Sequence, residues 1–221
     1  MIHKEIARGK AKIVASITSA EQIPKAEQSG ADIIEARLDL FKSIEKEKLR
    51  SSLPLIATNR PKTEGGAFGG TEKERINLLI SMLDSVDAVD IELNCKSSAA
   101  VIGEARKRGL TTIVSYHDFK KTPHNSRLRA ILEKELTTGD IAKIAVMANT
   151  IEDVMRMLKL GLEFKGGRIC IIAMGALGRH FRAIAPVYGS ILAYGAIDER
   201  EKTAPSQLTV KELNDLRRLL W

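Results

Sequence analysis

The sequence predicts an α/β fold, a single (β/α)8 or TIM barrel that spans residues 1–221. Eight apolar segments of strand length alternate with segments of helical character, as in the consecutive strand–helix units of a parallel sheet. The 221 residues leave about 27 for each of eight units, which suits a barrel of nearly minimal size. No stretch rich in Ser or Pro and no shift in composition divides the chain, so we expect one domain.

The expected elements follow one another in regular order along the chain. Short apolar runs predict strands at 13–17, 33–38, 55–59, 88–93, 112–117, 142–147, 169–174 and 191–196. Apolar residues spaced three and four apart predict helices at 72–83, 98–108, 126–136, 151–160 and 209–220. The last helix opens with Thr209 and Glu212, the spacing of a capping box.

An open, doubly wound sheet would show the same alternation of strands and helices. The number of strands and the weakness of any dinucleotide-binding fingerprint favour the barrel. The glycine-rich segment 65–71 has the GxxxxG spacing of a phosphate-binding loop but lacks the lysine that should follow it. We interpret this segment as a mobile loop between a strand and a helix.

The composition limits the classes of function. With 44% hydrophobic and 29% charged residues, the chain is typical of a globular protein. Aromatic residues make up 4%, too few for a base-stacking platform, and the net charge of +7 comes from scattered residues. We therefore expect attraction for small anions and no nucleic-acid partner.

The N-terminal segment, the apolar runs and the cysteines indicate the cellular compartment. The basic N-terminal segment lacks an apolar stretch, and no apolar run approaches the ~18 residues of a membrane helix, so we expect a cytoplasmic protein with no membrane partner. Cys95 and Cys170 lie far apart with no CxxC motif, as expected for reduced thiols that bind no metal.

Charged residues interrupt the apolar strands on one face. Residues two apart in a strand share a face, so Glu35, Arg37 and Asp39 lie opposite Ile34, Ala36, Leu38 and Leu40. The later strands carry further polar residues on a shared face: Thr58 and Arg60, then Asp90, Glu92 and Asn94, then Ser115 and His117, then Lys143. We expect these side chains to face the barrel interior and to converge at its C-terminal mouth, where barrel enzymes have their sites.

Lys143 and His117 indicate the chemistry. A lysine among Ile, Ala, Val and Met loses hydration, which favours the neutral amine, a nucleophile toward carbonyl groups. His117 is the histidine that falls inside a strand, and Glu92 on the neighbouring strand could orient its ring. These residues suggest Schiff-base chemistry with acid–base assistance. The alternative is structural: Lys143 could form a salt bridge with Glu35, and His117 could be a satisfied polar group.

A set of short motifs in order gives the chain a resemblance to the type I 3-dehydroquinate dehydratases over nearly its whole length. The motifs are EARLD at 35–39, Arg60 with EGG at 64–66, DIEL at 90–93, SYHDF at 115–119, KIAVM at 143–147, Arg182 with VYGS at 187–190, and Ala204 and Pro205 before Gln207. Each motif is weak alone, but their order and spacing together are specific.

The resemblance implies dehydration of 3-dehydroquinate to 3-dehydroshikimate, the third step of the shikimate pathway. Lys143 would form an imine with the C3 carbonyl of the substrate. This electron sink acidifies the C2 proton, so the reaction needs no metal or other cofactor. His117 would remove that proton and then protonate the departing C1 hydroxyl, while Glu92 would hold and tune His117.

The resemblance also implies how the substrate is bound. Arg182 would bind the carboxylate, and Glu35, Arg37 and Arg60 would contact ring hydroxyls or hold one another in place. Gln207 would close over the ligand from the loop after the eighth strand. Thr203 stands where the family usually has Ser, and Ser206 where Gly is common, so the mobility of this loop could differ. The family is often dimeric, which implies a homodimer.

Two other functions compete with this interpretation. A class I aldolase could use the same barrel and the same lysine chemistry, with the glycines of 175–178 forming a phosphate site. Arg182 and Gln207, however, suit a carboxylate and hydroxyls better. A basic nucleic-acid-binding protein would give no reason for burying Lys143.

Overall fold

The computed structural model describes residue 2, residues 11–200, 202–204 and 206–221. Eight parallel strands form one sheet in the order β7-β6-β5-β4-β3-β2-β1-β8. Their bounds are β1 Lys12–Ile17, β2 Ile33–Arg37, β3 Leu55–Thr58, β4 Ala88–Glu92, β5 Thr111–Asp118, β6 Ile141–Met147, β7 Ile169–Met174 and β8 Leu192–Ala196. Each expected strand is present with bounds within one residue of the prediction.

The sheet curls into a nearly closed barrel. The two ends of the strand order, β7 and β8, approach each other through a parallel bridge between Ile169 and Ser190. The backbone N–H of Ile191 donates to the carbonyl of Ile169 at 2.8 Å, just before β8 begins. The predicted (β/α)8 fold is therefore confirmed, and the open-sheet alternative is excluded.

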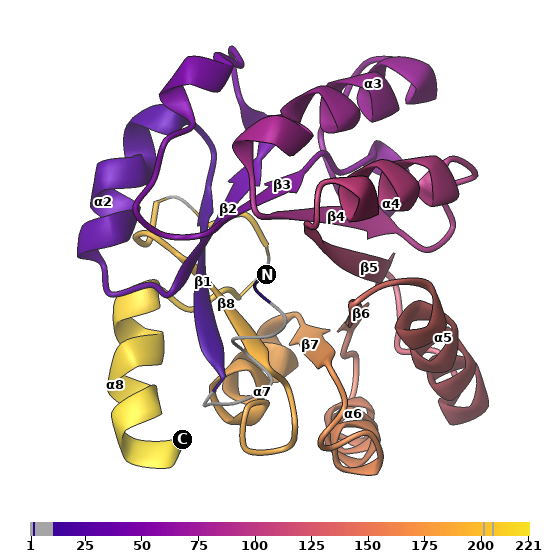
Figure 1. The fold of residues 1–221 in the computed structure, drawn as a ribbon. Helices are drawn as coiled ribbons and strands as arrows, with labels where there is room; N and C mark the ends of the chain where they lie inside the picture. The colour runs from indigo at the N-terminus through magenta and orange to yellow at the C-terminus, as the bar shows by residue number, and fades with distance from the viewer. Residues whose placement is uncertain (1, 3–10, 201, 205) are drawn as a thin grey trace.

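Helices surround this barrel on its outside (Figure 1). Their bounds are α2 Ile23–Gln28, α3 Glu72–Met82, α4 Ser98–Lys107, α5 Asn125–Thr138, α6 Ile151–Glu163, α7 Arg179–Ile184 and α8 Val210–Leu220. The predicted capping box at Thr209 is present, because its side chain accepts from the Glu212 N–H and Glu212 accepts from the Thr209 N–H. The helices α2 and α7 were not predicted, since six residues are too short to show helical periodicity.

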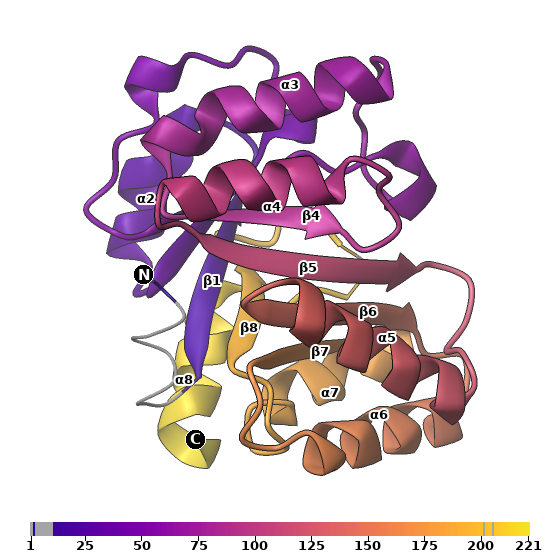
Figure 2. The same cartoon turned by 45° about the vertical axis from the view of Figure 1, so that its right-hand side comes forward.

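The strands point the same way, so their C-terminal ends meet at one end of the barrel (Figure 2). The interior is apolar where the strands begin: Ile33, Ile56, Ala88, Ile113, Ile141 and Leu192 form one buried cluster there. Polar residues replace them toward the C-terminal ends, among them Glu35, Asp90, Ser115 and Lys143, all at least nine-tenths buried. The apolar floor therefore lies beneath a polar layer at the C-terminal ends of the strands.

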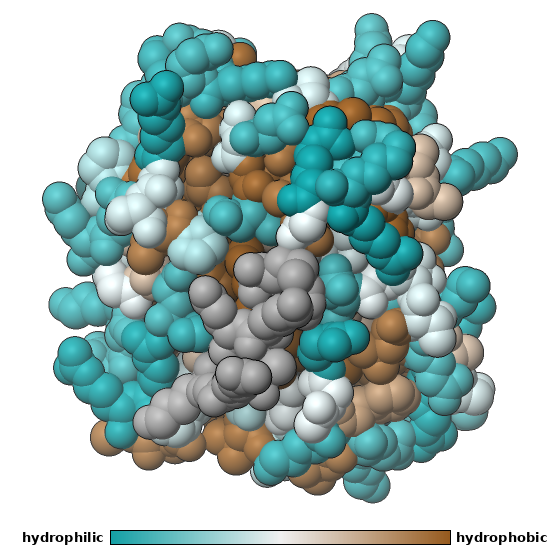
Figure 3. Space-filling model, viewed as in Figure 1, coloured by the Kyte–Doolittle hydropathy of each residue, from teal (hydrophilic) through white to brown (hydrophobic). Residues whose placement is uncertain are grey.

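Hydrophilic side chains spread around the periphery of the face shown in Figure 3. No helix in the described ranges is long and apolar enough to cross a membrane.

Candidate active site

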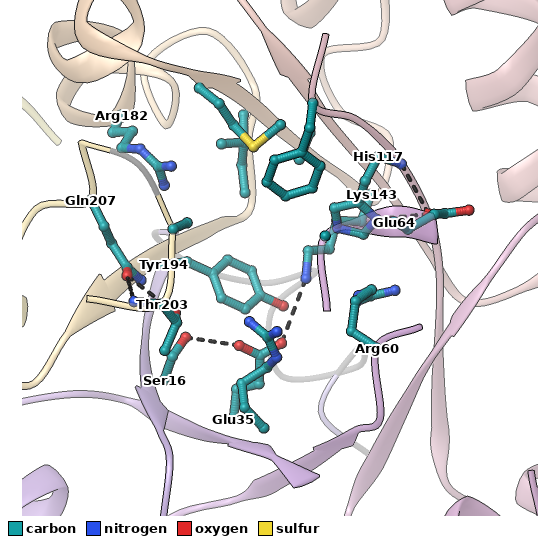
Figure 4. A pocket seen from close by; sticks show the side chains of 17 residues that line it. Ser16, Glu35, Arg60, Glu64, His117, Lys143, Arg182, Tyr194, Thr203 and Gln207 are labelled. Carbon is teal, nitrogen blue, oxygen red and sulfur yellow. Dashed lines mark hydrogen bonds and ion pairs between the residues drawn. The ribbon is translucent and has the colours of Figure 1, made fainter. Parts of the chain in front are cut away.

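A cavity opens among the loops at the C-terminal ends of the strands (Figure 4). The open space within it, its wide mouth included, is about 520 Å³. Its polar and charged lining comes from Ser16, Glu35, Arg37, Arg60, Glu64, His117, Lys143, Arg182, Tyr194, Thr203 and Gln207. The apolar part of the lining comes from Phe119, Ala145, Ile172 and Met174.

Lys143 extends from the middle of β6 into this cavity. Its Nζ lies 2.9 Å from Asp90 Oδ2 and 3.6 Å from Glu35 Oε1. The ring of Tyr194 lies under the same nitrogen, 4.1 Å from its centroid. The salt bridge with Glu35 that the structural alternative named is thus present, but Asp90 is the nearer carboxylate. Two anions and an aromatic face hold the lysine at a fixed place in the wall.

Asp90 connects the lysine to the rest of the polar layer. Arg60 Nη2 lies 2.7 Å from its Oδ1, and the Ser115 hydroxyl donates to the same oxygen at 2.6 Å. Burial alone would raise the pKa of Asp90, but Arg60 and Lys143 hold it well below its usual value. Asp90 is therefore an anion in the described structure. The sequence indicated that its side chain faces the barrel interior but gave it no role beside Lys143.

His117, at the end of β5, pairs with Glu64. Its Nδ1 lies 3.0 Å from Glu64 Oε2, and its backbone N–H donates to the same oxygen at 3.1 Å. Burial, together with the positive charges of Arg60 and Lys143, lowers the pKa of His117 well below its usual value. Burial raises the pKa of Glu64 to about 7, against the opposing effect of Arg60. A neutral imidazole therefore faces the cavity, held through one ring nitrogen.

The predicted contact between Glu92 and His117 is wrong. Glu92 instead lies 2.5 Å from Arg60 Nη1 and 2.8 Å from Arg75 Nη1, and it does not line the cavity. The sheet register explains the difference. Glu92 pairs with Ser115, which lies two residues before His117 on β5 and therefore farther from the C-terminal end of the strand. Glu92 thus positions Arg60, whereas the carboxylate that reaches His117 comes from a loop.

The loop after β3 places Glu64. Gly65 has φ +78°, a left-handed conformation that glycine adopts easily, and a Cβ on Gly66 would lie 2.0 Å from the Arg60 carbonyl oxygen. These glycines turn the chain sharply just after Glu64, so the side chain points inward. The sequence predicted a mobile loop at 65–71 and gave Glu64 no role in the site; the EGG motif at 64–66 was the available signal.

Glu35 and Arg37 of β2 line the same cavity. Glu35 accepts from the hydroxyls of Ser16 at 2.8 Å and Thr58 at 2.9 Å. Arg37 forms a two-bond pair with Asp39, through Nε at 3.0 Å and Nη2 at 2.8 Å. Carboxylate and guanidinium groups at fixed positions can bind hydroxyl groups of a ligand.

Arg182 enters from α7 on the far side of the cavity (Figure 4). Burial lowers its pKa to about 10, so the guanidinium is charged at pH 7. Gln207 is buried in the loop after β8, where its Oε1 accepts from the Thr203 N–H at 2.9 Å and from its hydroxyl at 3.2 Å. This arrangement suits an anionic ligand with hydroxyl groups.

The structure thus brings eight of the nine predicted site residues to one cavity: Lys143, His117, Glu35, Arg37, Arg60, Arg182, Thr203 and Gln207. Glu92 is the exception. Glu64, Ser16 and Tyr194 line the cavity without having been assigned to the site. Ser16 lies two residues after Val14, and Tyr194 two residues after Leu192, so each shares the inward face of its strand with a residue of the interior apolar cluster. Strand periodicity was therefore the signal for their inward direction.

Among the described residues, no group of three or more His, Cys, Asp and Glu side chains could hold a metal ion. The fold and the cavity together define a barrel enzyme with a buried lysine, a neutral histidine and a cationic ligand pocket.

Sequence comparison identifies the family. The model of the type I 3-dehydroquinase family matches residues 14–220, so the chain belongs to that family. It is 44% identical to the 3-dehydroquinate dehydratase of Methanosarcina acetivorans, with 96% of this chain and 95% of that protein covered. The corresponding protein of Methanocella arvoryzae is 39% identical, with 95% and 96% covered.

Solved structures show the same relationship. The type I 3-dehydroquinate dehydratase of Clostridium difficile, with covalent modified comenic acid, superposes with a TM-score of 0.87 at 30% identity, covering 96% of this chain and 92% of that one. The Aquifex aeolicus enzyme gives 0.83 at 31% identity, covering 95% and 99%.

Proposed function

We propose that this chain converts 3-dehydroquinate to 3-dehydroshikimate, a reaction of the shikimate pathway, through an imine on Lys143, and that residues 1–221 act as one catalytic domain. The observation that carries the proposal is that the Lys143 amine and the His117–Glu64 pair face one cavity in a member of this family. Family membership also removes the grounds for a class I aldolase.

Lys143 supplies the electron sink. Its nitrogen bonds to the C3 carbonyl carbon of the substrate, and the carbonyl oxygen leaves as water. The protonated imine draws electrons from the adjacent C2–H bond, which makes that proton acidic. Asp90 and Glu35 hold the lysine in place and balance its positive charge. A positive nitrogen at this position is therefore stabilised throughout the imine stage.

His117 moves the proton. As a neutral imidazole it takes the C2 proton, and the electron pair of that bond moves to give an enamine. The resulting imidazolium returns the proton to the C1 hydroxyl, which leaves as water. Ionised Glu64 accepts the hydrogen bond of Nδ1–H, so the other ring nitrogen is the base. Addition of water to the imine then releases the product and restores Lys143.

The remaining polar residues hold the substrate. Arg182 binds the carboxylate, which offsets the cost of burying the guanidinium and suits its forked geometry. Glu35, Arg37 and Arg60 contact ring hydroxyls or hold one another in place. Thr203 donates two hydrogen bonds to the side-chain carbonyl of Gln207, so the N–H groups of the same side-chain amide can donate to the ligand. The binding site thus combines one cationic subsite with several hydroxyl subsites.

The chain acts as a cytoplasmic homodimer. Cys95 and Cys170 are free thiols, as suits a reducing compartment. An apolar stripe of Ile151, Met155 and Leu162 lies along the outer face of α6, each side chain at least half exposed. These residues share one face of the helix, so a second copy of the chain could cover them together.

Turnover assays of the wild type and one Lys143 variant test the proposal. The purified protein should form 3-dehydroshikimate from 3-dehydroquinate, at the same rate with a metal chelator present. Lys143→Arg keeps a positive charge beside Asp90 and Glu35 but lacks a nucleophilic amine at pH 7, so it should show no detectable turnover. Turnover by Lys143→Arg near the wild-type rate would contradict the proposal.

A further inference from the structure

The Tyr194 hydroxyl is a buried polar group without a hydrogen-bond partner in the described structure. The residue is 6% exposed and lines the catalytic cavity from β8. Its hydroxyl end points toward the Lys143–Glu35 pair in Figure 4. Leaving a buried hydroxyl without a partner is costly, and such a group in a folded protein calls for an explanation.

The other hydroxyl groups of the described site already have acceptors. Ser16 and Thr58 donate to Glu35, and Ser115 donates to Asp90. Thr203 donates to Gln207. Burial, with a smaller effect of Glu35, raises the pKa of Tyr194 well above its usual value, so it keeps its proton. Tyr194 is therefore the hydroxyl at this site that can donate to a group bound at Lys143.

Imine formation on Lys143 needs such a donor. When a lysine ammonium and a ketone give a protonated imine and water, two protons move from the lysine nitrogen to the ketone oxygen. No external acid or base is consumed. His117 transfers the proton at C2. The centroid of the Tyr194 ring lies 4.1 Å from Lys143 Nζ, the nitrogen at which the transfers of imine formation begin.

We propose that Tyr194 is a further catalytic residue, which relays protons from the Lys143 nitrogen to the C3 oxygen of the substrate while the imine forms. In each transfer, the Tyr194 oxygen accepts a proton from nitrogen as it donates its own to the substrate oxygen, so the tyrosine ends unchanged. In the first transfer, the lone pair freed on nitrogen bonds to C3, and the substrate oxygen becomes the hydroxyl of a carbinolamine. In the second, the C3–O bond breaks, that oxygen leaves as water, and the freed lone pair on nitrogen forms the C=N bond. The inference rests on the imine mechanism proposed above.

Time-resolved borohydride trapping tests this role. Wild type and Tyr194→Phe are mixed with 3-dehydroquinate, quenched with sodium borohydride at increasing times, and the modified fraction of Lys143 is measured by peptide mass spectrometry. Tyr194→Phe keeps the ring against Lys143 and removes only the hydroxyl. Tyr188→Phe, outside the cavity, is the matched control.

The relay predicts that Tyr194→Phe forms the adduct about 10²-fold more slowly than wild type, within the range of general acid–base groups, whereas Tyr188→Phe traps at the wild-type rate. The thermal unfolding midpoint of Tyr194→Phe should not fall, because the lost hydroxyl has no partner. Unchanged trapping in Tyr194→Phe overturns the relay, whether or not turnover falls. If wild type itself forms no adduct, the imine mechanism fails as well, so the two failures are distinguishable.

Discussion

His117 and Glu64 behave as one titrating pair. The imidazole is neutral because burial and two nearby cations oppose its protonation, and burial raises the pKa of Glu64 to about 7. Below that pH the pair keeps one proton on the carboxyl group, which then donates to Nδ1. Above it, the carboxylate accepts from Nδ1–H, and the opposite ring nitrogen becomes a base.

This pair should set the pH dependence of catalysis. In wild type, kcat/KM should rise as the pH increases through about 7, because Glu64 ionises there. In Glu64→Gln this limb should disappear, and turnover at pH 8 should fall by about tenfold or more, since no carboxylate stabilises the imidazolium. Steady-state assays from pH 5 to 9 check this, with exposed Glu133→Gln as control. A limb near pH 7 that persists in Glu64→Gln would assign it to another group.

The same pair should change how the free energy of unfolding depends on pH. Just below pH 6.5 the folded pair holds one proton on Glu64, and the unfolded chain holds one on His117, so their contributions to the pH slope cancel. In Glu64→Gln the folded protein binds no such proton. Its free energy of unfolding should therefore fall with acidification below pH 6.5, by up to about 1.4 kcal/mol per pH unit more than in wild type.

Denaturant unfolding at several pH values measures this slope. The Glu133→Gln control should run parallel to wild type. Parallel curves for Glu64→Gln and wild type would show that the pair is not coupled in the folded state.

At the scale of elements, the β3–α3 loop is what delivers Glu64 to the end of β5. Gly65 adopts a left-handed backbone, and Gly66 packs against the Arg60 carbonyl. Phe119 closes over Gly65, because a Cβ on Gly65 would lie 2.2 Å from its ring. The catalytic pair therefore depends on the packing of a turn against the strand that precedes it.

Gly66→Ala tests this dependence. The added Cβ would collide with the Arg60 backbone, so the turn must shift and withdraw Glu64, at a cost of roughly 1–3 kcal/mol in stability. The variant should also lose the limb of kcat/KM near pH 7, as Glu64→Gln does. Gly69→Ala in the same loop meets no atom within 4 Å and should resemble wild type in both measurements. Wild-type stability and activity in Gly66→Ala would refute the role of the turn.

At the scale of the molecule, the α6 stripe predicts the assembly. Met155 and Leu162 are each 50% exposed on one helix face. Sedimentation should show a dimer for wild type and a monomer for Met155→Glu at micromolar concentrations, since a buried unpaired carboxylate opposes association. Leu219→Glu, at an 80% exposed position on α8, should remain a dimer. A dimeric Met155→Glu would place the interface elsewhere.

The parts of the molecule that could be predicted are those with a regular period. Alternation along a strand placed Glu35, Lys143 and His117 inside the barrel, because a one-residue error would expose a whole apolar face. The partner of His117 could not be derived this way, since Glu64 reaches it from a loop whose path depends on two glycines. Tyr194 was not predicted as a site residue, because an aromatic residue in an apolar strand indicates a side chain packed in the hydrophobic core.

The proposed reaction depends on a covalent imine between Lys143 and the substrate. Borohydride reduction of the wild-type protein in the presence of 3-dehydroquinate, followed by peptide mass spectrometry, tests it most directly. One stable adduct is expected, on Lys143, with loss of activity in proportion to its formation. Protein that turns over 3-dehydroquinate but yields no adduct, or an adduct on another residue, would contradict it.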